Sequence, residues 1–397
     1  MKKNKYLISL DRIKKSAQKM SKILTPTPCI FEWYSSNLTG SQIYMKLENM
    51  NIVKSFKIRG ALNAILNLDK KKVKGVITAS AGNHAQGVAY SATKAGIKSI
   101  IVMPKSAPMA KINATKGFGG TVVADKCNTF DECNQYAQQQ AKALNYTFVP
   151  PFDSEDVIAG QATIGLEMMQ QVPDLDMVIV QIGGGGLIAG VASAIKQINP
   201  KVKIVGVKVK TSPAMVNSWK TKKLHGESTG IPTLADGMAV KMPGKITYSV
   251  VKDLVDDMVT VSEDEIANAI AFLQEKGKIV SEGAGACGMA AILAKKVNIK
   301  GKKVGIIISG GNIDPDKLSS VTKKTMMAQG RMGMLHIKLS SKTAKKFRED
   351  IKKYGAKVYY QDGTLMESII LNTQMSLDIY FPDKSSMKNF SKSYNVI

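Results

Sequence analysis

Arginine is scarce in this chain, although the chain is strongly basic. The formal net charge is +25, yet all but four of the 56 basic residues are lysine. Nucleic-acid surfaces depend on arginine for bidentate and stacking contacts, and here the lysines are spread along the whole sequence. We therefore expect no specific nucleic-acid partner and interpret the charge as a compositional bias.

Paired cysteine motifs and long apolar runs are also missing. Cys29, Cys127, Cys133 and Cys287 form no Cys-x-x-Cys pair and have no His-flanked metal spacing. This indicates a reducing cytosol, and we expect no metal site. The apolar run near the N-terminus is too short for a signal peptide, and no window is long enough to span a membrane. The expectation is a cytoplasmic protein without a membrane partner.

What the sequence does contain is a series of short apolar strands that alternate with helices. The strands are predicted at residues 72–78, 99–103, 176–181, 203–207 and 303–308. Such βαβ units imply an α/β fold with parallel sheets, whose ligands bind at the carboxyl ends of the strands. After residue 330 the order changes to strand, helix, strand, strand and helix, which predicts a small appended α+β domain.

Lys57 stands between Phe56 and a predicted helix over residues 61–66. A cation in the first turn of a helix is disfavoured by the helix dipole, so we expect a lowered pKa for Lys57. Its amine would then be available as a Schiff-base nucleophile. In a chain this rich in lysine, the simpler interpretation of Lys57 is an ordinary surface lysine. Other features of the sequence must distinguish the two interpretations.

Four glycines, Gly183 to Gly186, lie between a predicted strand and a predicted helix. Their backbone N–H groups predict an anion site, with phosphate as the usual ligand. The alternative is a flexible turn. The spacing Gly184-x-Gly186-x-x-Ala189 also fits a dinucleotide site, but such a site needs an acid at the end of the following strand. That strand ends in Lys208-Val209-Lys210, so NAD is disfavoured and a 2′-phosphorylated dinucleotide stays open.

The segment Ser80 to His84 combines a hydroxyl, a glycine and an amide at a helix start. Its backbone donors suit a carboxylate, and Asn83 could hydrogen-bond a phenolic oxygen. His84 by itself is more often a structural histidine. Ser309 offers a hydroxyl at the end of another strand. Together these segments predict an amine, a phosphate cradle, a carboxylate cradle and a hydroxyl at one edge of a sheet.

The motifs KLEN, SFKIRGA, ASAGNHAQGVA, PFDSEDVIAGQATIGLE, GGGGLIAG, TLADGMAVK and SGGN follow one another between residues 25 and 315. On these motifs the chain resembles the fold type II pyridoxal-phosphate enzymes and, within them, the threonine ammonia-lyases. The resemblance implies pyridoxal 5′-phosphate as cofactor and a two-domain core with twisted parallel or mixed sheets. The implied large domain comprises residues 1–45 and 154–325, with a small domain, 46–153, inserted in it. Residues 331–397 resemble a degenerate ACT-like regulatory domain.

The resemblance also implies a role for each candidate residue. Lys57 would bond covalently to the cofactor and later move the Cα proton of the substrate. The other implied cofactor contacts are Phe56 beside the ring, Asn83 at the ring oxygen, Ser309 at the pyridine nitrogen, and Gly183, Gly184, Gly185, Gly186 and Leu187 at the phosphate. The loop that receives the substrate carboxylate would consist of Ser80, Ala81, Gly82, Asn83 and His84.

The implied reaction is elimination of water from L-threonine, which yields 2-oxobutanoate and ammonia, with a side activity on L-serine. A serine dehydratase or a serine racemase-like enzyme is the alternative, although such racemases carry a second serine where this chain has Ala81. A degenerate family member that acts as a binding or regulatory protein is the non-enzyme alternative. A homodimer or homotetramer and an allosteric small-molecule effector are further expectations, and a role in isoleucine biosynthesis or in threonine catabolism stays open.

Between residues 25 and 315 the chain departs from the family pattern at two places. Val53-Lys54 stands where the family commonly has Thr-Gly, and Lys208 replaces a frequent glutamate.

Overall fold

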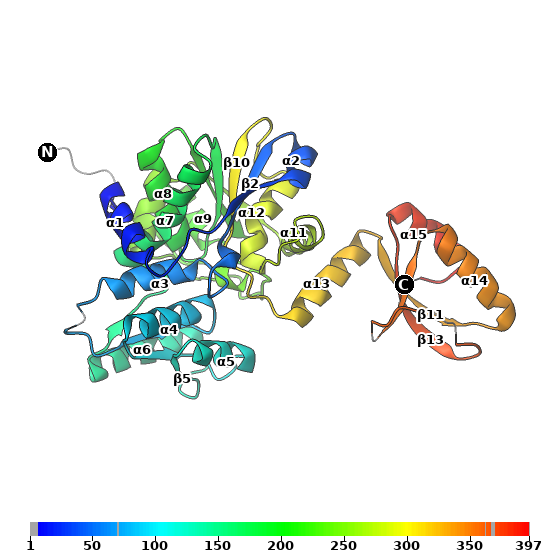
Figure 1. Ribbon diagram of the computed structural model, residues 1–397, viewed down its shortest axis with the longest axis horizontal. Coiled ribbons are helices and arrows are strands. Elements are labelled where there is room, and N and C mark those ends of the chain that lie inside the picture. Colours follow the sequence, from blue (N-terminus) through cyan, green and yellow to red (C-terminus); the bar gives the residue numbers. More distant parts are fainter. Residues whose placement is uncertain (1–6, 70, 362, 367–369, 397) are drawn as a thin grey trace. The chain divides into compact units, whose positions relative to one another are not determined.

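The computed structural model describes residues 7–69, 71–361, 363–366 and 370–396. The chain forms two compact units, Met1–Ile313 and Asp314–Ile397. Figure 1 labels their helices and strands.

The first unit contains a six-stranded sheet in the order β1-β2-β10-β7-β8-β9. Its strands are β1 (Cys29–Glu32), β2 (Gln42–Leu47), β10 (Lys303–Ile308), β7 (Met177–Gln181), β8 (Lys203–Val209) and β9 (Asp257–Val261). All neighbours are parallel except β1, which pairs antiparallel with β2. Every residue of β7 is buried, as expected for a parallel strand covered on both faces.

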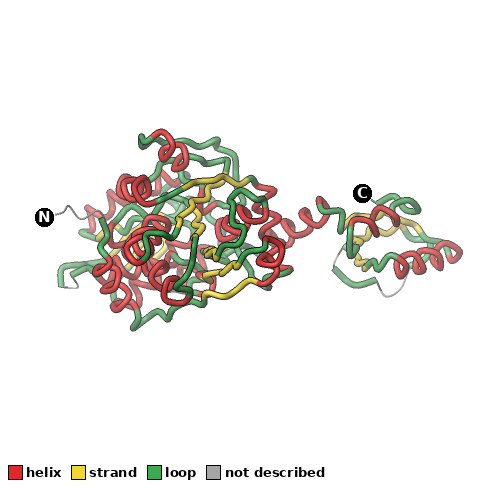
Figure 2. The backbone as a smooth tube through the Cα atoms, turned by 90° about the horizontal axis from the view of Figure 1, so that it is seen from above, coloured by secondary structure: helices red, strands yellow, loops and turns green. Residues whose placement is uncertain are grey.

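Helices cover both faces of this sheet. Figure 1 shows α1 (Leu10–Met20), α7 (Glu155–Gln171) and α8 (Gly186–Ile198) on one side, with α11 (Glu263–Glu275) and α12 (Gly283–Leu293) on the other. In Figure 2 the strands of this unit lie among the surrounding helices. The further helices around the sheet are α2 (Trp33–Thr39), α9 (Ala214–Thr221), α10 (Lys245–Leu254) and the 3-10 turns η1 (Glu48–Met50) and η2 (Asp236–Met238).

A second, four-stranded sheet of the same unit has the order β5-β4-β3-β6, with all neighbours parallel. Its strands are β3 (Val76–Ala79), β4 (Ser99–Val102), β5 (Thr121–Val123) and β6 (Thr147–Phe148). The accompanying helices are α3 (Lys57–Leu66), α4 (Asn83–Ala95), α5 (Met109–Gly117) and α6 (Phe130–Leu144). The α/β class with parallel and mixed sheets is therefore confirmed.

Cys127 and Cys133, which lie beside this smaller sheet, form a disulfide with 2.01 Å between the sulfur atoms. The predicted reducing compartment rested on the absence of a Cys-x-x-Cys pair, and that argument does not cover cysteines six positions apart. Cys29 and Cys287 are free.

The Asp314–Ile397 unit begins with α13 (Pro315–Ala328) and continues with a three-stranded antiparallel sheet in the order β11-β13-β12. Its elements are β11 (Met332–Lys338), α14 (Ser341–Lys353), β12 (Lys357–Tyr360), β13 (Gln374–Tyr380) and α15 (Lys384–Phe390). The predicted order of strand, helix, strand, strand and helix is confirmed. Phe347 and Phe390 lie at the centre of its core, both fully buried.

None of the helices in the described part of the chain combines the length and the apolar character needed to cross a membrane.

Candidate active site

Lys57 is the first residue of α3, as the sequence predicts. The preceding residues are fixed to the end of β10, because Ser55 forms a β-bridge with Gly310 and the Phe56 amide donates to the Ser309 carbonyl over 2.9 Å. The helix holds this position through buried residues, among them Ile58 and Leu62. The backbone of Lys57 is thereby placed beside that of Ser309, at the carboxyl end of a central strand.

The Lys57 ammonium points inward and donates to the carbonyl of Pro151 over 2.8 Å. It lies 5.3 Å from the centre of the Phe56 ring. Burial of the ammonium lowers the pKa of Lys57 to about 8, against the opposing attraction of Glu282. The predicted direction is confirmed, but the cause is desolvation and not the helix dipole used in the sequence argument.

Glu282, just before α12, forms a polar chain with two asparagines. The Asn83 amide donates to both carboxylate oxygens of Glu282, over 2.8 and 3.1 Å, and the Asn312 amide donates to Asn83 Oδ1 over 2.6 Å. Burial raises the pKa of Glu282 to about 7, and nearby Asp236 also raises it. Sequence reasoning did not assign Glu282 to the site; the available signal was one acid directly before the glycine-rich segment 283–288.

The segment Ser80 to His84 joins β3 to α4. The Gly82 amide donates to Ser80 Oγ over 3.2 Å, which closes a tight turn around half-buried Ala81. His84 is buried, and its Nε2 donates to the Val149 carbonyl over 3.0 Å. Burial lowers the pKa of His84 to about 3, so the ring is neutral. Its Nδ1 is buried with no partner in the described structure, so His84 offers a hydrogen-bond acceptor.

The glycine loop Gly183–Gly186 joins β7 to α8. Gly185 has a φ of 102°, which a residue with a Cβ rarely adopts. A Cβ on Gly184 would lie 2.5 Å from atoms of the Phe152 ring. The backbone N–H groups of Gly184 and Gly185 donate no hydrogen bond within the described part of the chain. Unpaired N–H groups at a helix N-terminus form an anion site.

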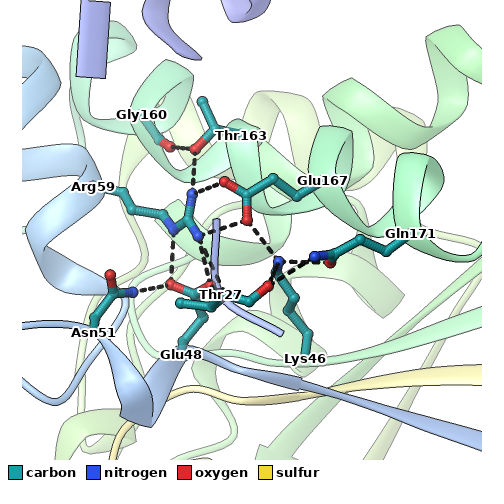
Figure 3. Close-up of polar contacts among 9 residues, drawn as sticks. All are labelled: Thr27, Lys46, Glu48, Asn51, Arg59, Gly160, Thr163, Glu167 and Gln171. Carbon is teal, nitrogen blue, oxygen red and sulfur yellow. Dashed lines mark hydrogen bonds and ion pairs between the residues drawn. The ribbon is translucent and has the colours of Figure 1, made fainter. Parts of the chain in front are cut away.

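A buried network of two cations and two carboxylates fixes α3 to β2 and α7, and Figure 3 shows its contacts. Arg59, two residues after Lys57, bonds with both carboxylates: with Glu48 over 2.8 and 2.9 Å and with Glu167 over 2.6 and 2.8 Å. The Lys46 ammonium donates to Glu167 over 2.6 Å. Because the charges balance and each carboxylate has several donors, the network sets the orientation of the helix that begins at Lys57.

Comparison with known proteins identifies the family to which this site belongs. A family model described as "Pyridoxal-phosphate dependent enzyme" matches residues 20–310. The chain belongs to this family. A member from Thermotoga maritima, L-threonine ammonia-lyase, is 46% identical over 326 residues, which is 82% of this chain and 80% of that protein.

Two solved structures are also similar to this chain. Threonine deaminase isoform 2 from Solanum lycopersicum matches with a TM-score of 0.75 and 37% identity, over 79% of this chain and 92% of that chain. Serine racemase from Dictyostelium discoideum matches with a TM-score of 0.73 and 35% identity, over 77% of this chain and 99% of that chain. The family model ends at residue 310, so it does not extend over the Asp314–Ile397 unit.

The residues of this site fit the cofactor of a pyridoxal-phosphate dependent enzyme. The unpaired N–H groups of the glycine loop suit its phosphate, and Lys57 is an inward-pointing amine with a lowered pKa. Direct contacts join Asn83 to Glu282, and the Phe56 amide to the Ser309 carbonyl. Ser80, Ala81 and Gly82 continue directly into Asn83 and His84. The predicted residues thus lie at the carboxyl ends of β3, β7 and β10, apart from Phe56 and Lys57, which stand at the start of α3 beside Ser309.

Proposed function

We propose that this chain is an L-threonine ammonia-lyase, which converts L-threonine to 2-oxobutanoate and ammonia by elimination of water. The observation that carries the proposal is the 46% identity to the Thermotoga maritima L-threonine ammonia-lyase over 326 residues, in a chain whose lysine, glycine loop and Asn83 loop are intact. Bound pyridoxal 5′-phosphate supplies the electron sink for the charge that develops at the substrate Cα.

Lys57 is the proposed base that removes the Cα proton. Its pKa of about 8 leaves part of the amine neutral near neutral pH, which a base requires. We assign the phosphate to Gly183, Gly184, Gly185, Gly186 and Leu187, the ring oxygen to Asn83, the ring face to Phe56 and the pyridine nitrogen to Ser309. A neutral hydroxyl at that nitrogen does not stabilise a protonated ring, which favours prompt loss of the β-hydroxyl.

The substrate carboxylate is assigned to the loop formed by Ser80, Ala81, Gly82, Asn83 and His84. Neutral His84 does not act as a proton donor there, because its pKa is about 3. Its inward side chain instead holds the loop against Val149. The released enamine hydrolyses to 2-oxobutanoate and ammonia without further help from the protein.

L-Serine dehydration or serine racemisation is the second candidate function, favoured by the likeness to the Dictyostelium serine racemase. Racemisation needs an acid on the ring face opposite Lys57, and Ala81 has no hydroxyl to provide one. Threonine differs from serine by one methyl group, which a pocket distinguishes by only ~1–3 kcal/mol. We therefore expect serine to be a slower substrate.

The test measures 2-oxobutanoate from L-threonine, and pyruvate and D-serine from L-serine, with the purified holoenzyme. The proposal predicts 2-oxobutanoate as the fastest product, less pyruvate and little D-serine. Rapid formation of D-serine would favour the racemase, and bound cofactor without any keto acid would contradict the lyase.

Several proposals concern organisation rather than chemistry. We propose a large domain of residues 1–45 and 154–325, an inserted small domain of residues 46–153, and an ACT-like regulatory domain of residues 331–397 that binds a small-molecule effector. We also propose a cytoplasmic location and a homodimer or homotetramer. The oligomer is supported by exposed apolar side chains on edge strand β1 and on α2, namely Ile30, Phe31, Trp33, Tyr34 and Leu38. Isoleucine biosynthesis and threonine catabolism are both compatible with the reaction.

A further inference from the structure

Lys208 is a fully buried lysine next to the glycine loop. It lies on β8, beside β7, and its side chain has no exposure to solvent. Its ammonium donates to the Met238 carbonyl over 2.5 Å and reaches the Gly183 carbonyl at 3.5 Å. No ion pair among the described residues includes Lys208. A buried charge without a counter-charge is costly, so its presence needs a reason.

The contrast with Lys46 shows what is unusual here. Lys46 is equally buried, but its ammonium donates a hydrogen bond to the Glu167 carboxylate over 2.6 Å. The Lys208 ammonium contacts only carbonyl oxygens. Burial lowers the pKa of Lys208 to about 7, and Cys287 opposes this shift. Its ammonium therefore lacks an anion within the described part of the chain.

The missing anion fits on the other side of the glycine loop. The Gly183 carbonyl and the Gly184 N–H belong to one planar peptide unit and point in opposite directions. An ammonium at the carbonyl polarises that unit and strengthens its N–H as a donor. The Gly184 N–H is one of the groups with no acceptor in the described chain. A phosphate monoester, with a charge of about −1.5 to −2, would complete the alignment.

We propose that Lys208 is a positioning residue that supplies the buried counter-charge for the cofactor phosphate, acting through the Gly183–Gly184 peptide. The inference rests on the proposed assignment of the glycine loop to the phosphate. It also explains why a lysine stands at the strand end where a dinucleotide site would need an acid. The Met238 carbonyl also holds the ammonium in place. The neighbouring Gly237 packs against the glycine loop, because a Cβ on Gly183 would lie 2.7 Å from the Gly237 carbonyl oxygen.

The test compares two ligands that differ only in the phosphate, pyridoxal 5′-phosphate and pyridoxal. The protein is freed of cofactor, and binding of each ligand is followed by visible absorbance for the wild type, Lys208→Met and Lys208→Arg. Lys203→Met is the matched control, because Lys203 is exposed on the same strand. Thermal unfolding of each cofactor-free protein reports on folding.

We expect Lys208→Met to weaken pyridoxal 5′-phosphate binding by roughly ten- to hundredfold, because the Gly183 carbonyl loses its contact with a charged donor and the Gly184 N–H becomes a weaker donor to the phosphate. Pyridoxal binding should stay within about threefold of the wild type on the same reasoning. Lys208→Arg should retain most of the preference for the phosphate, and Lys203→Met should change neither affinity. Cofactor-free Lys208→Met should be at least as stable as the wild type, since it lacks an uncompensated buried charge.

One result would overturn the inference while leaving the proposed function in place, namely an unchanged ratio of the two dissociation constants in Lys208→Met. If both affinities fall equally and the cofactor-free protein is also less stable, Lys208 has a purely structural role between Gly183 and Met238. If the wild type itself binds no pyridoxal 5′-phosphate, the proposed function fails and the inference with it.

Discussion

The buried network around Arg59 allows one prediction to be worked out in detail. Its guanidinium makes four bonds to two carboxylates, at 2.6, 2.8, 2.8 and 2.9 Å. Charge-assisted bonds at ~1.5–3 kcal/mol each would give ~6–12 kcal/mol, an upper bound because the carboxylates keep other donors. Removal of one partner of a buried ion pair costs ~3–5 kcal/mol in measured cases. We expect Arg59→Met to lower the free energy of unfolding by this amount.

The two carboxylates do not lose the same share of their donors in Arg59→Met. Glu167 keeps the Lys46 ammonium, whereas Glu48 keeps only the neutral donors Thr27 and Asn51. Glu48 is therefore the uncompensated charge in Arg59→Met. Adding Glu48→Gln should restore ~1–2 kcal/mol, a coupling typical of residues in one network. A double variant less stable than Arg59→Met would refute this reasoning.

The assay is urea unfolding at neutral pH, with the transition midpoint compared at equal slope. Arg12→Met is the control, because Arg12 also pairs with two carboxylates, Glu155 and Asp156, but with 35–44% of each side chain exposed. An exposed pair contributes ~0–1 kcal/mol. If Arg59→Met lowers the free energy of unfolding by no more than Arg12→Met does, burial does not account for the stability that this network provides.

pH provides a second check on the same variant. Although burial raises it, the pKa of Glu167 is held below its ordinary value of 4.5 by Arg59 and Lys46. A carboxyl group whose pKa is lowered by folding stabilises the fold at any pH above its ordinary pKa. This stability is lost as the pH falls through the lowered pKa. The difference between wild type and Arg59→Met should therefore narrow below about pH 4.5.

Three further predictions concern the site and its flanks. Lys54 has a φ of 56° and is exposed, so Lys54→Gly should raise the urea midpoint by the equivalent of ~1 kcal/mol while Lys54→Ala should not; equal effects would contradict the strain argument. Burial raises the pKa of Glu282 from 4.5 to about 7. The wild type should therefore lose stability as the pH rises through this range, whereas Glu282→Gln should not, as tested by unfolding at pH 5 and 8. Gly184→Ala should abolish cofactor binding measured by absorbance, because its Cβ would lie 2.5 Å from Phe152; retained binding would show that the loop can shift.

Local patterns predicted the parts of the site that depend on backbone geometry. Lys57 at a helix start and the glycine loop between strand and helix follow from signals within a few residues. Lys54 belongs to the same class: the sequence marked it as a departure, and its positive φ explains why glycine is common there.

Features that depend on distant residues were not predicted. Glu282 and Asn83 lie 199 positions apart, and Arg59 and Glu167 lie 108 apart, so no local pattern links them. The Cys127–Cys133 disulfide was missed because its spacing matches no common motif. The lowered pKa of Lys57 was predicted for the wrong reason, since burial is not visible in the sequence around it.

The most direct test of the central claim is the site of covalent attachment of the cofactor. The holoenzyme is reduced with borohydride and digested, and the modified peptide is identified by mass spectrometry. We expect a single lysine, Lys57, to carry the pyridoxyl group, and Lys57→Ala to lose both the label and the formation of 2-oxobutanoate from L-threonine. Label on Lys208 or on many surface lysines, with Lys57 unmodified in an active enzyme, would contradict it.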